Sequence, residues 1–180
     1  MRKLTHDEIS QNRASLSELH LVKKLPVYVV LHSIRSSYNV GSIFRTSDGA
    51  MIEKLYLCGY TPHPPKKEIL KTALGATESI KWEYVKDTLT VINELKNAGL
   101  KICALELTEN SKPYYELTEE DFPLALVVGN EISGVSQEVL DNCDFSIEIP
   151  QYGIKQSLNV AVAYGITIFR LRELFDKIKT

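Results

Sequence analysis

The sequence predicts a single α/β domain in which a mostly parallel β-sheet is covered by helices on both faces. Short apolar runs bounded by turn residues alternate with longer amphipathic stretches, and several runs are apolar at successive positions. Such runs are typical of strands buried on both faces, and strand–helix alternation is typical of parallel sheets. A length of 180 residues suits one such domain.

Five runs are predicted to be strands because they are short, mostly apolar and bounded by turn residues. In chain order they span residues 27–32, 54–59, 101–107, 124–129 and 145–150. Three prolines between residues 61 and 67 exclude regular structure from the connection after the second strand.

Two stretches between the strands have the spacing of amphipathic helices. Residues 39–51 place Val40, Ile43 and Phe44 on one face, and residues 87–98 stop at Gly99, a residue that commonly ends helices. We expect these helices to cover the sheet.

The last predicted helix, residues 157–169, is apolar nearly all round and becomes polar only at Arg170. A surface helix keeps a polar face, so this helix is expected to be buried on more than one side. In so small a domain the second cover is another subunit, which predicts a homodimer. Complete burial within the monomer is the alternative.

Residues 1–24 are polar, with irregularly spaced apolar residues, and are predicted to form one or two helices ahead of the domain. The predicted boundaries are therefore an N-terminal extension over residues 1–24 and the main domain over residues 25–180. The extension either packs as a cap or touches a substrate or partner chain.

Composition restricts the classes of function. The formal net charge is −2, whereas nucleic-acid binders are often strongly basic. Local basic clusters such as Lys66, Lys67 and Lys71 leave nucleic-acid binding open, because the distribution of charge matters more than its sum. No apolar run reaches the roughly 18–20 residues of a membrane span, and the first residues lack the apolar core of a secretory signal. We therefore expect a cytoplasmic protein.

The cysteines lie far apart at Cys58, Cys103 and Cys143, and each sits in or beside an apolar run. No pair has the C-x-x-C spacing of a zinc or redox site. They are predicted to be buried free thiols, and no metal site is expected.

The first segment with chemical potential is residues 36–49, S-S-Y-N-V-G-S-I-F-R-T-S-D-G, which follows a strand and opens a helix. Asn39 stands at an expected N-cap position, and backbone N–H groups at such a helix start can bind an anion. Arg45 lies off the apolar face. The simpler alternative is that Asn39 only caps the helix and that Arg45 pairs with Asp48.

Two later segments also place polar residues at strand ends. In residues 127–136, V-V-G-N-E-I-S-G-V-S, Gly129 ends a strand and Glu131 follows. This edge is where α/β sheets bind ligands, although no phosphate-binding glycine pattern is present. In residues 149–163, Ser157 and Asn159 stand where the last helix begins. Either they cap that helix or they bind a substrate or cofactor carboxylate.

Together, in this order and at these spacings, the three segments resemble the signature motifs of the SpoU/TrmH family of RNA 2′-O-ribose methyltransferases. The combination is N-x-G-x-I-x-R-T, then G-N-E-x-x-G, then I-P followed by S-L-N-V-A-V-A. The resemblance covers about residues 26–172, which is nearly the whole chain.

The resemblance implies a SPOUT fold, whose C-terminal part forms a deep trefoil knot involving the second and third segments. It also implies a homodimer that binds S-adenosylmethionine in the knotted loops, largely through backbone groups. The cofactor-binding residues it implies are Leu105, or its neighbour Glu106, with Gly129, Ile149, Ser157 and Leu158.

By the same resemblance, Arg45 is the catalytic arginine of ribose methylation. It either takes the proton of the 2′-hydroxyl with help from a substrate phosphate, or stabilises the developing alkoxide and anchors the phosphate. A guanidinium is almost never deprotonated in proteins, which makes the electrostatic role as reasonable as the first. The polar residues implied to orient Arg45 and the ribose are Asn39, Glu131, Ser157 and Asn159.

Departures from the family pattern concern substrate fit. Residues 36–38 replace the usual Asn-Pro or Asp-Pro, and Gln151 replaces the usual Met after Ile-Pro. Without the separate RNA-binding domain of many rRNA-modifying relatives, the chain resembles the small members that act on tRNA, and rRNA is the alternative. The remaining alternatives are a catalytically inactive binder of RNA or cofactor and an unrelated nucleotide-binding α/β domain.

Overall fold

The computed structural model describes residues 1–178; Lys179 and Thr180 lie outside the described residues. Seven strands form one sheet in the order β3-β2-β1-β6-β4-β7-β5, and every neighbouring pair is parallel. The strands are β1 (Leu25–His32), β2 (Ile52–Cys58), β3 (Trp82–Val85), β4 (Lys101–Leu105), β5 (Lys112–Pro113), β6 (Leu124–Val128) and β7 (Phe145–Glu148). The predicted parallel α/β architecture is confirmed.

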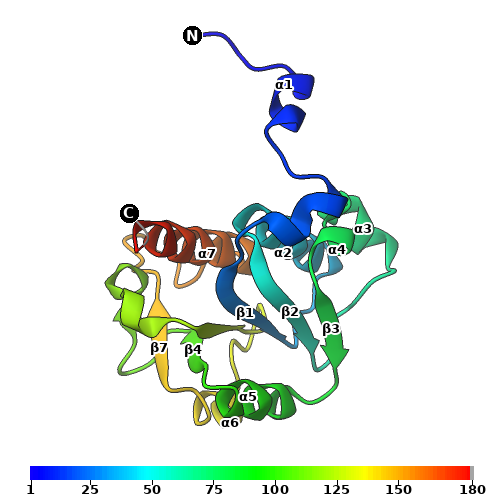
Figure 1. Cartoon of the computed structure of the whole chain (residues 1–180). Helices are drawn as coiled ribbons and strands as arrows, with labels where there is room; N and C mark the ends of the chain where they lie inside the picture. The colour runs from blue at the N-terminus through cyan, green and yellow to red at the C-terminus, as the bar shows by residue number, and fades with distance from the viewer. Residues whose placement is uncertain (179–180) are drawn as a thin grey trace.

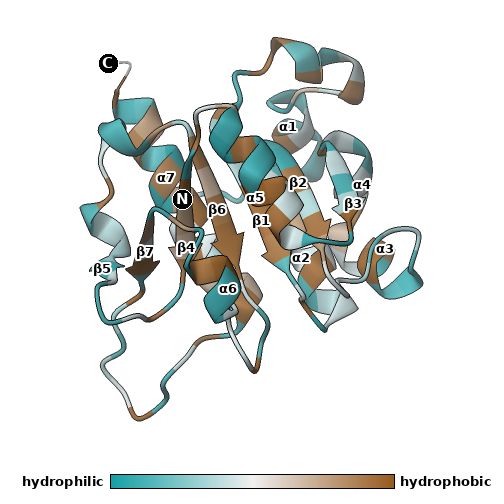
Figure 2. Ribbon diagram, turned by 90° about the horizontal axis from the view of Figure 1, so that it is seen from below, coloured by the Kyte–Doolittle hydropathy of each residue, from teal (hydrophilic) through white to brown (hydrophobic). Residues whose placement is uncertain are grey.

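Helices cover both faces of this sheet (Figure 1). One face carries α2 (Ser37–Ala50), α3 (Lys67–Ala73), α4 (Ala76–Ser79) and α7 (Val160–Lys177). The other carries α5 (Thr88–Asn97) and α6 (Gln137–Leu140). Figure 2 shows the apolar strands enclosed between the two helical layers.

A separate apolar core fills each space between sheet and helices. On the α2 and α7 side, Phe44 and Tyr164 are fully buried, and the Tyr164 hydroxyl lies 2.7 Å from the Ser47 hydroxyl oxygen. On the α5 side, Ile92 and Val139 pack against the opposite face of the strands. Two cores explain why the central strands are apolar at successive positions.

The starts of α2 and α7 differ from the predictions. Ser36, not Asn39, caps α2, because its hydroxyl accepts a hydrogen bond from the Asn39 backbone N–H. The prediction that Asn39 is the N-cap is therefore wrong, and its side chain is free for another partner. Asn159 does cap α7, which begins at Val160 rather than at the predicted Ser157.

The N-terminal residues form two short helical segments, α1 (His6–Gln11) and the 3-10 helix η1 (Leu16–Leu21). Thr5 and Glu8 close a capping box around α1, which buries none of its residues. Figure 1 shows α1 standing away from the sheet. The division of the chain at residue 24 stays a prediction.

The connections contain short elements that the sequence patterns did not indicate. The 3-10 helices η2 (Tyr114–Glu116) and η3 (Glu119–Asp121) lie between β5 and β6. Cys58 and Cys103 are buried free thiols as predicted, whereas Cys143 is a free thiol that is only partly buried; burial raises the pKa of Cys58 to about 12 and that of Cys143 to about 11. Among the described residues, no helix is long and apolar enough to cross a membrane, and no three His, Cys, Asp or Glu side chains gather into a metal site.

Candidate active site

Glu131, just after β6, joins the second motif to the start of α2. Its carboxylate accepts hydrogen bonds from the Arg35 backbone N–H at 2.8 Å, the Ser36 backbone N–H at 3.0 Å and the Asn39 side-chain amide at 2.8 Å. These donors come from more than 90 residues away in the sequence. Glu131 thereby fixes the loop that leads from β1 into α2.

The same three donors determine the charge of Glu131. Partial burial would by itself raise the pKa of the carboxyl group, but the hydrogen bonds from Arg35, Ser36 and Asn39 outweigh it, and the net pKa is lowered. Glu131 is therefore ionised at neutral pH. The positive end of the α2 dipole lies beside it and favours the same state.

Asn39 connects Glu131 to the third motif. Its Nδ2 donates to Glu131, and its Oδ1 accepts a hydrogen bond of 3.1 Å from the Asn159 side-chain amide. Asn159 in turn caps α7, because its Oδ1 accepts from the Ala161 and Val162 backbone N–H groups at 2.9 and 3.3 Å. One continuous chain of hydrogen bonds thus links residues of all three motifs.

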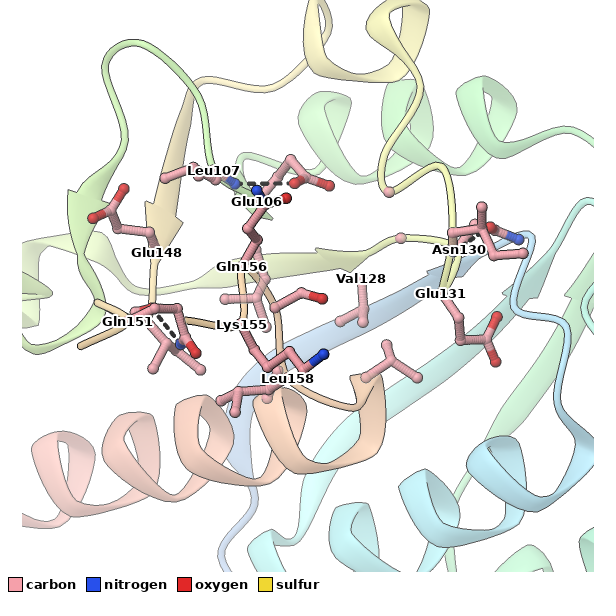
Figure 3. A pocket seen from close by; sticks show the side chains of 18 of the residues that line it. Glu106, Leu107, Val128, Asn130, Glu131, Glu148, Gln151, Lys155, Gln156 and Leu158 are labelled. Carbon is pink, nitrogen blue, oxygen red and sulfur yellow. Dashed lines mark hydrogen bonds between the residues drawn. The ribbon is translucent and has the colours of Figure 1, made fainter. Parts of the chain in front are cut away.

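A cavity of about 560 Å³ adjoins this polar chain at the carboxyl ends of β4, β6 and β7. Figure 3 shows Glu131 at one end of the cavity, Glu148 and Gln151 at the other, and Glu106 between them. The predicted residues that line it are Leu105, Gly129, Glu131, Ile149, Ser157 and Leu158. The other predicted site residues, Asn39, Arg45 and Asn159, are not part of its lining.

The loop after β6 leaves no room for a side chain at Gly129. A Cβ atom there would overlap the backbone of Gly134 and Val135, because the chain turns back on itself. Asn130 and Gly134 exchange two backbone hydrogen bonds of 3.0 Å, and Gly134 has a φ of 65°. Gly134 therefore requires the left-handed conformation that glycine adopts without strain.

Asn130 organises the same loop; it stands in the G-N-E motif but was not named among the predicted site residues. It is 6% exposed, and its Oδ1 accepts from the Ile132 and Ser133 backbone N–H groups at 2.8 and 3.0 Å. Its amide donates to the Ser33 carbonyl oxygen at 2.8 Å. The signal in the sequence that could have identified it is its place in the G-N-E motif.

Glu106, the alternative to Leu105 in the sequence analysis, holds the far side of this loop. Its carboxylate accepts hydrogen bonds from the Val135 backbone N–H at 2.8 Å and the Leu107 backbone N–H at 3.0 Å. Each carboxylate oxygen keeps a further lone pair for a ligand in the cavity. Both Leu105 and Glu106 line the cavity, so the two alternatives do not exclude each other.

Arg45 is exposed on α2 and stands apart from the cavity lining. Within residues 1–178 its guanidinium forms no hydrogen bond or ion pair, and Asp48 accepts a hydrogen bond of 2.5 Å from Ser79 instead. The alternative of an Arg45–Asp48 ion pair is therefore wrong. Ser157 is also exposed and, in the described part of the chain, makes no side-chain hydrogen bond.

Sequence comparison agrees with this arrangement. The profile described as the SpoU rRNA Methylase family matches residues 26–169, which is most of the chain. The chain belongs to the SpoU rRNA methylase family. All three motifs of this SpoU protein, and the cavity between them, lie within or at the edge of the matched region.

Individual relatives support the family assignment. The tRNA (guanosine(18)-2′-O)-methyltransferase of Aquifex aeolicus (strain VF5) is 35% identical to this SpoU protein over 158 residues, which is 86% of this chain and 72% of that protein. The crystal structure of the A. aeolicus TrmH/SpoU tRNA modifying enzyme has a TM-score of 0.81 and 31% identity, and the match covers 91% of this chain and 83% of that chain.

A second solved structure is that of an AdoMet-bound rRNA methyltransferase from Sinorhizobium meliloti. It has a TM-score of 0.78 and 30% identity, and the match covers 86% of this SpoU protein and 59% of that chain. Several further curated relatives are longer, and this chain spans 58–60% of their length. The shared part is the domain that contains the cavity.

Proposed function

We propose that this SpoU protein is an S-adenosylmethionine-dependent methyltransferase that methylates a ribose 2′-hydroxyl of RNA. The observation that carries the proposal is the hydrogen-bonded chain Glu131–Asn39–Asn159, which joins the three motifs at the edge of the cavity. A solved relative is described as AdoMet-bound, and a curated relative is named as a 2′-O-methyltransferase.

The cavity fits S-adenosylmethionine in size and chemistry. Its volume of about 560 Å³ lies within the roughly 300–1,000 Å³ of small-molecule sites. Apolar side chains of Leu105, Ile149 and Leu158 suit an adenine ring, and Gly129, which also lines the cavity, offers backbone groups. The carboxylates of Glu106 and Glu131 favour a ligand that carries positive charge.

When bound, the cofactor supplies a methyl group already activated by the positive sulfonium. The protein has to align the 2′-oxygen with this methyl group and to stabilise the negative charge that develops as the hydroxyl proton leaves. Arg45 is proposed for this role, either as the group that takes the proton with help from a phosphate or as the cation that stabilises the oxygen and anchors the phosphate. The positioning residues of the proposal are Asn39, Glu131, Ser157 and Asn159.

A homodimer belongs to the same proposal. Val162 and Phe169 of α7 are 51% and 50% exposed, so the monomer does not provide the complete burial that was the alternative. A Cβ at Gly49 would lie 3.3 Å from the Phe169 ring, and Arg45 stands one turn before Gly49 on α2. A partner packed on this apolar face would therefore cover the surface that carries Arg45.

The preferred substrate is tRNA, with rRNA as the alternative. The support is the A. aeolicus relative named as a tRNA methyltransferase, which the chain covers more completely than its longer relatives. A cytoplasmic location and the trefoil knot of the SPOUT fold are also parts of this proposal.

The test is methyl transfer from labelled S-adenosylmethionine to total tRNA and to rRNA, followed by digestion and identification of the labelled nucleosides. We expect label in 2′-O-methyl nucleosides with the wild type and with Arg172→Ala, and at least a hundredfold loss of rate with Arg45→Ala. Arg45 is exposed, so its loss leaves the fold intact. Label found only on bases would refute ribose methylation, and cofactor binding without any transfer would indicate an inactive relative.

A further inference from the structure

An exposed surface beside the cavity combines cations with aromatic rings, although the chain as a whole has a net charge of −2. We call it the Lys–Tyr surface. It consists of seven exposed residues: Arg35, Tyr38, Tyr60, His63, Lys66, Lys67 and Lys71. Glu68 is the only acidic residue between positions 60 and 75.

The cations of the Lys–Tyr surface are not neutralised by the protein. Within residues 1–178, none of Arg35, Lys66, Lys67 and Lys71 forms an ion pair. Five lysines elsewhere are paired: Lys24 with Glu53, Lys54 with Glu83, Lys96 with Asp144, and Lys101 and Lys112 with Asp121, whereas Lys81, Lys86 and Lys155 also lack an ion pair within residues 1–178. With four cations and Glu68 as the one acidic residue along positions 60–75, this surface has a local excess of positive charge.

Hydrogen bonds connect the surface to the sequence motifs. The Arg35 backbone N–H donates to Glu131, and the Asn130 side-chain amide donates to the Tyr60 hydroxyl at 2.6 Å. The Thr72 hydroxyl donates to the Tyr38 carbonyl oxygen at 3.2 Å, which places α3 against the start of α2. The Lys–Tyr surface thus begins at the residues that flank Asn39 and Glu131.

Tyr60 is an anchored aromatic platform. Its side chain is 63% exposed although its hydroxyl is held by Asn130, a residue that is itself 6% exposed. Beside it, the His63 ring lies 4.8 Å from the Tyr84 ring, whose hydroxyl donates to the Gly59 carbonyl oxygen at 2.8 Å. The His63 ring also stacks on the Trp82 ring, with centroids 6.4 Å apart, so Tyr60 is the ring of the Lys–Tyr surface that is both anchored and exposed, which suits it to stacking with an unpaired base.

We propose that the Lys–Tyr surface binds an unpaired segment of the RNA substrate, with the lysines on phosphates and Tyr60 stacked on a base next to the methylated nucleotide. This inference rests on the proposed RNA methyltransferase function. Lysines alone would suit any polyanion, but interleaved aromatic rings favour single-stranded RNA over a duplex, whose bases are already stacked.

The first test measures RNA affinity as a function of salt concentration for Lys66→Ala/Lys67→Ala/Lys71→Ala. Each phosphate contact on a single strand contributes about 0.7 to the slope of log K against log salt, so loss of three contacts lowers the slope by about 2. We expect affinity to fall at least tenfold at low salt, while the calorimetric affinity for S-adenosylmethionine stays unchanged and shows that the fold is intact.

The matched control is Lys24→Ala/Lys54→Ala/Lys101→Ala. These lysines stand near the amino-terminal ends of β1, β2 and β4, at the sheet edge opposite the cavity. The control removes the same charge and is expected to leave the salt slope within about 0.5 of the wild type.

The second test concerns Tyr60 and compares two RNAs of one sequence, with the target nucleotide unpaired or in a duplex. We expect Tyr60→Ala to bind the unpaired form about tenfold more weakly and to lose the preference for it. Tyr60→Phe keeps the ring and loses only the bond to Asn130, so it should retain most of the preference.

The outcomes separate this inference from the proposed function. If the wild type neither binds nor methylates RNA, the proposed function fails. If the wild type methylates RNA but the triple lysine variant keeps its affinity and salt slope, the Lys–Tyr surface is not the binding surface. If poly-glutamate binds the surface and RNA does not displace it, the occupant is an acidic protein and the inference is overturned.

Discussion

At the scale of single residues, Glu131 has more hydrogen-bond partners from distant sequence than any other side chain described above. Its carboxylate accepts from two backbone N–H groups and one side-chain amide. In Glu131→Gln, an N–H₂ group would face one of these donors. We expect a loss of about 2 kcal/mol in the free energy of unfolding, and slower methyl transfer because Asn39 loses its orientation. Thermal unfolding and single-turnover rates measure the two effects, and unchanged values for both would contradict the role assigned to Glu131.

The lowered pKa of Glu131 also predicts a dependence on pH. As the pH falls, the unfolded chain binds the proton first, because its carboxyl group has the higher pKa, about 4.3. The stabilisation is therefore complete above that value and is lost as the pH falls through the lower pKa of the folded state. Urea unfolding between pH 6 and 3 should show a smaller decrease for Glu131→Gln than for the wild type.

Glu106 is a second residue whose role depends on the folded chain. In Glu106→Ala the backbone N–H of Val135, a residue only 5% exposed, loses its acceptor. We expect about a tenfold loss of affinity for S-adenosylmethionine, because an unpaired buried donor costs about 1–3 kcal/mol and the loop beside the cavity is released. Calorimetry with Glu148→Ala as the control tests this, since Glu148 lines the same cavity but its carboxylate, within residues 1–178, bonds only to the Ser111 side chain. Equal losses of affinity in both variants would show instead that removing any negative charge from the cavity weakens cofactor binding.

At the scale of elements, the start of α7 serves two functions through one residue. Asn159 caps the helix with its oxygen and donates to Asn39 with its amide. Asn159→Ala removes both interactions and is expected to cost about 1 kcal/mol of stability. Asn159→Asp keeps the cap and removes the donor, so its stability should stay near that of the wild type while its methyl-transfer rate falls. Equal stability losses in the two variants would contradict the separation of the two roles.

The elements also show where sequence patterns succeed. Five strands, β1, β2, β4, β6 and β7, were predicted, because short and mostly apolar runs bounded by turn residues leave a strong signal. β3 was missed because its four residues are only partly buried or exposed, and β5 because it has two residues. The N-cap of α2 was misplaced because Ser36, Ser37 and Asn39 are all good caps, and only the contact with Glu131 distinguishes them.

In the candidate site, residues that belong to a motif could be predicted, and residues that only folding brings together could not. The motif residues Asn39, Glu131 and Asn159 were named from the sequence, and the structure brings them together. Asn130 stands in the G-N-E motif but was not named, and the Lys–Tyr surface was not identified as part of the site, because its significance depends on which loops meet at the sheet edge. Spacing along the chain carries no information about such contacts.

At the scale of the whole molecule, the exposed apolar side chains of α7 predict association. Phe169→Glu places a charge in the centre of the proposed dimer face, where it would be buried without a partner. We expect sedimentation to show a dimer for the wild type and a monomer for this variant. Tyr115→Glu, at a side chain 49% exposed outside α7, should remain dimeric. A monomeric wild type would refute the dimer.

The position of β6 has a consequence for how the chain is made. β6 lies between β1 and β4, yet it is the sixth strand to leave the ribosome. Until residue 128 has emerged, the inner edge of β1 has no hydrogen-bonding neighbour, and the strand that carries the G-N-E motif is still missing. Because unpaired strand edges favour association with other chains, we expect the nascent chain to be prone to aggregation until the strand that leads into the G-N-E loop is inserted.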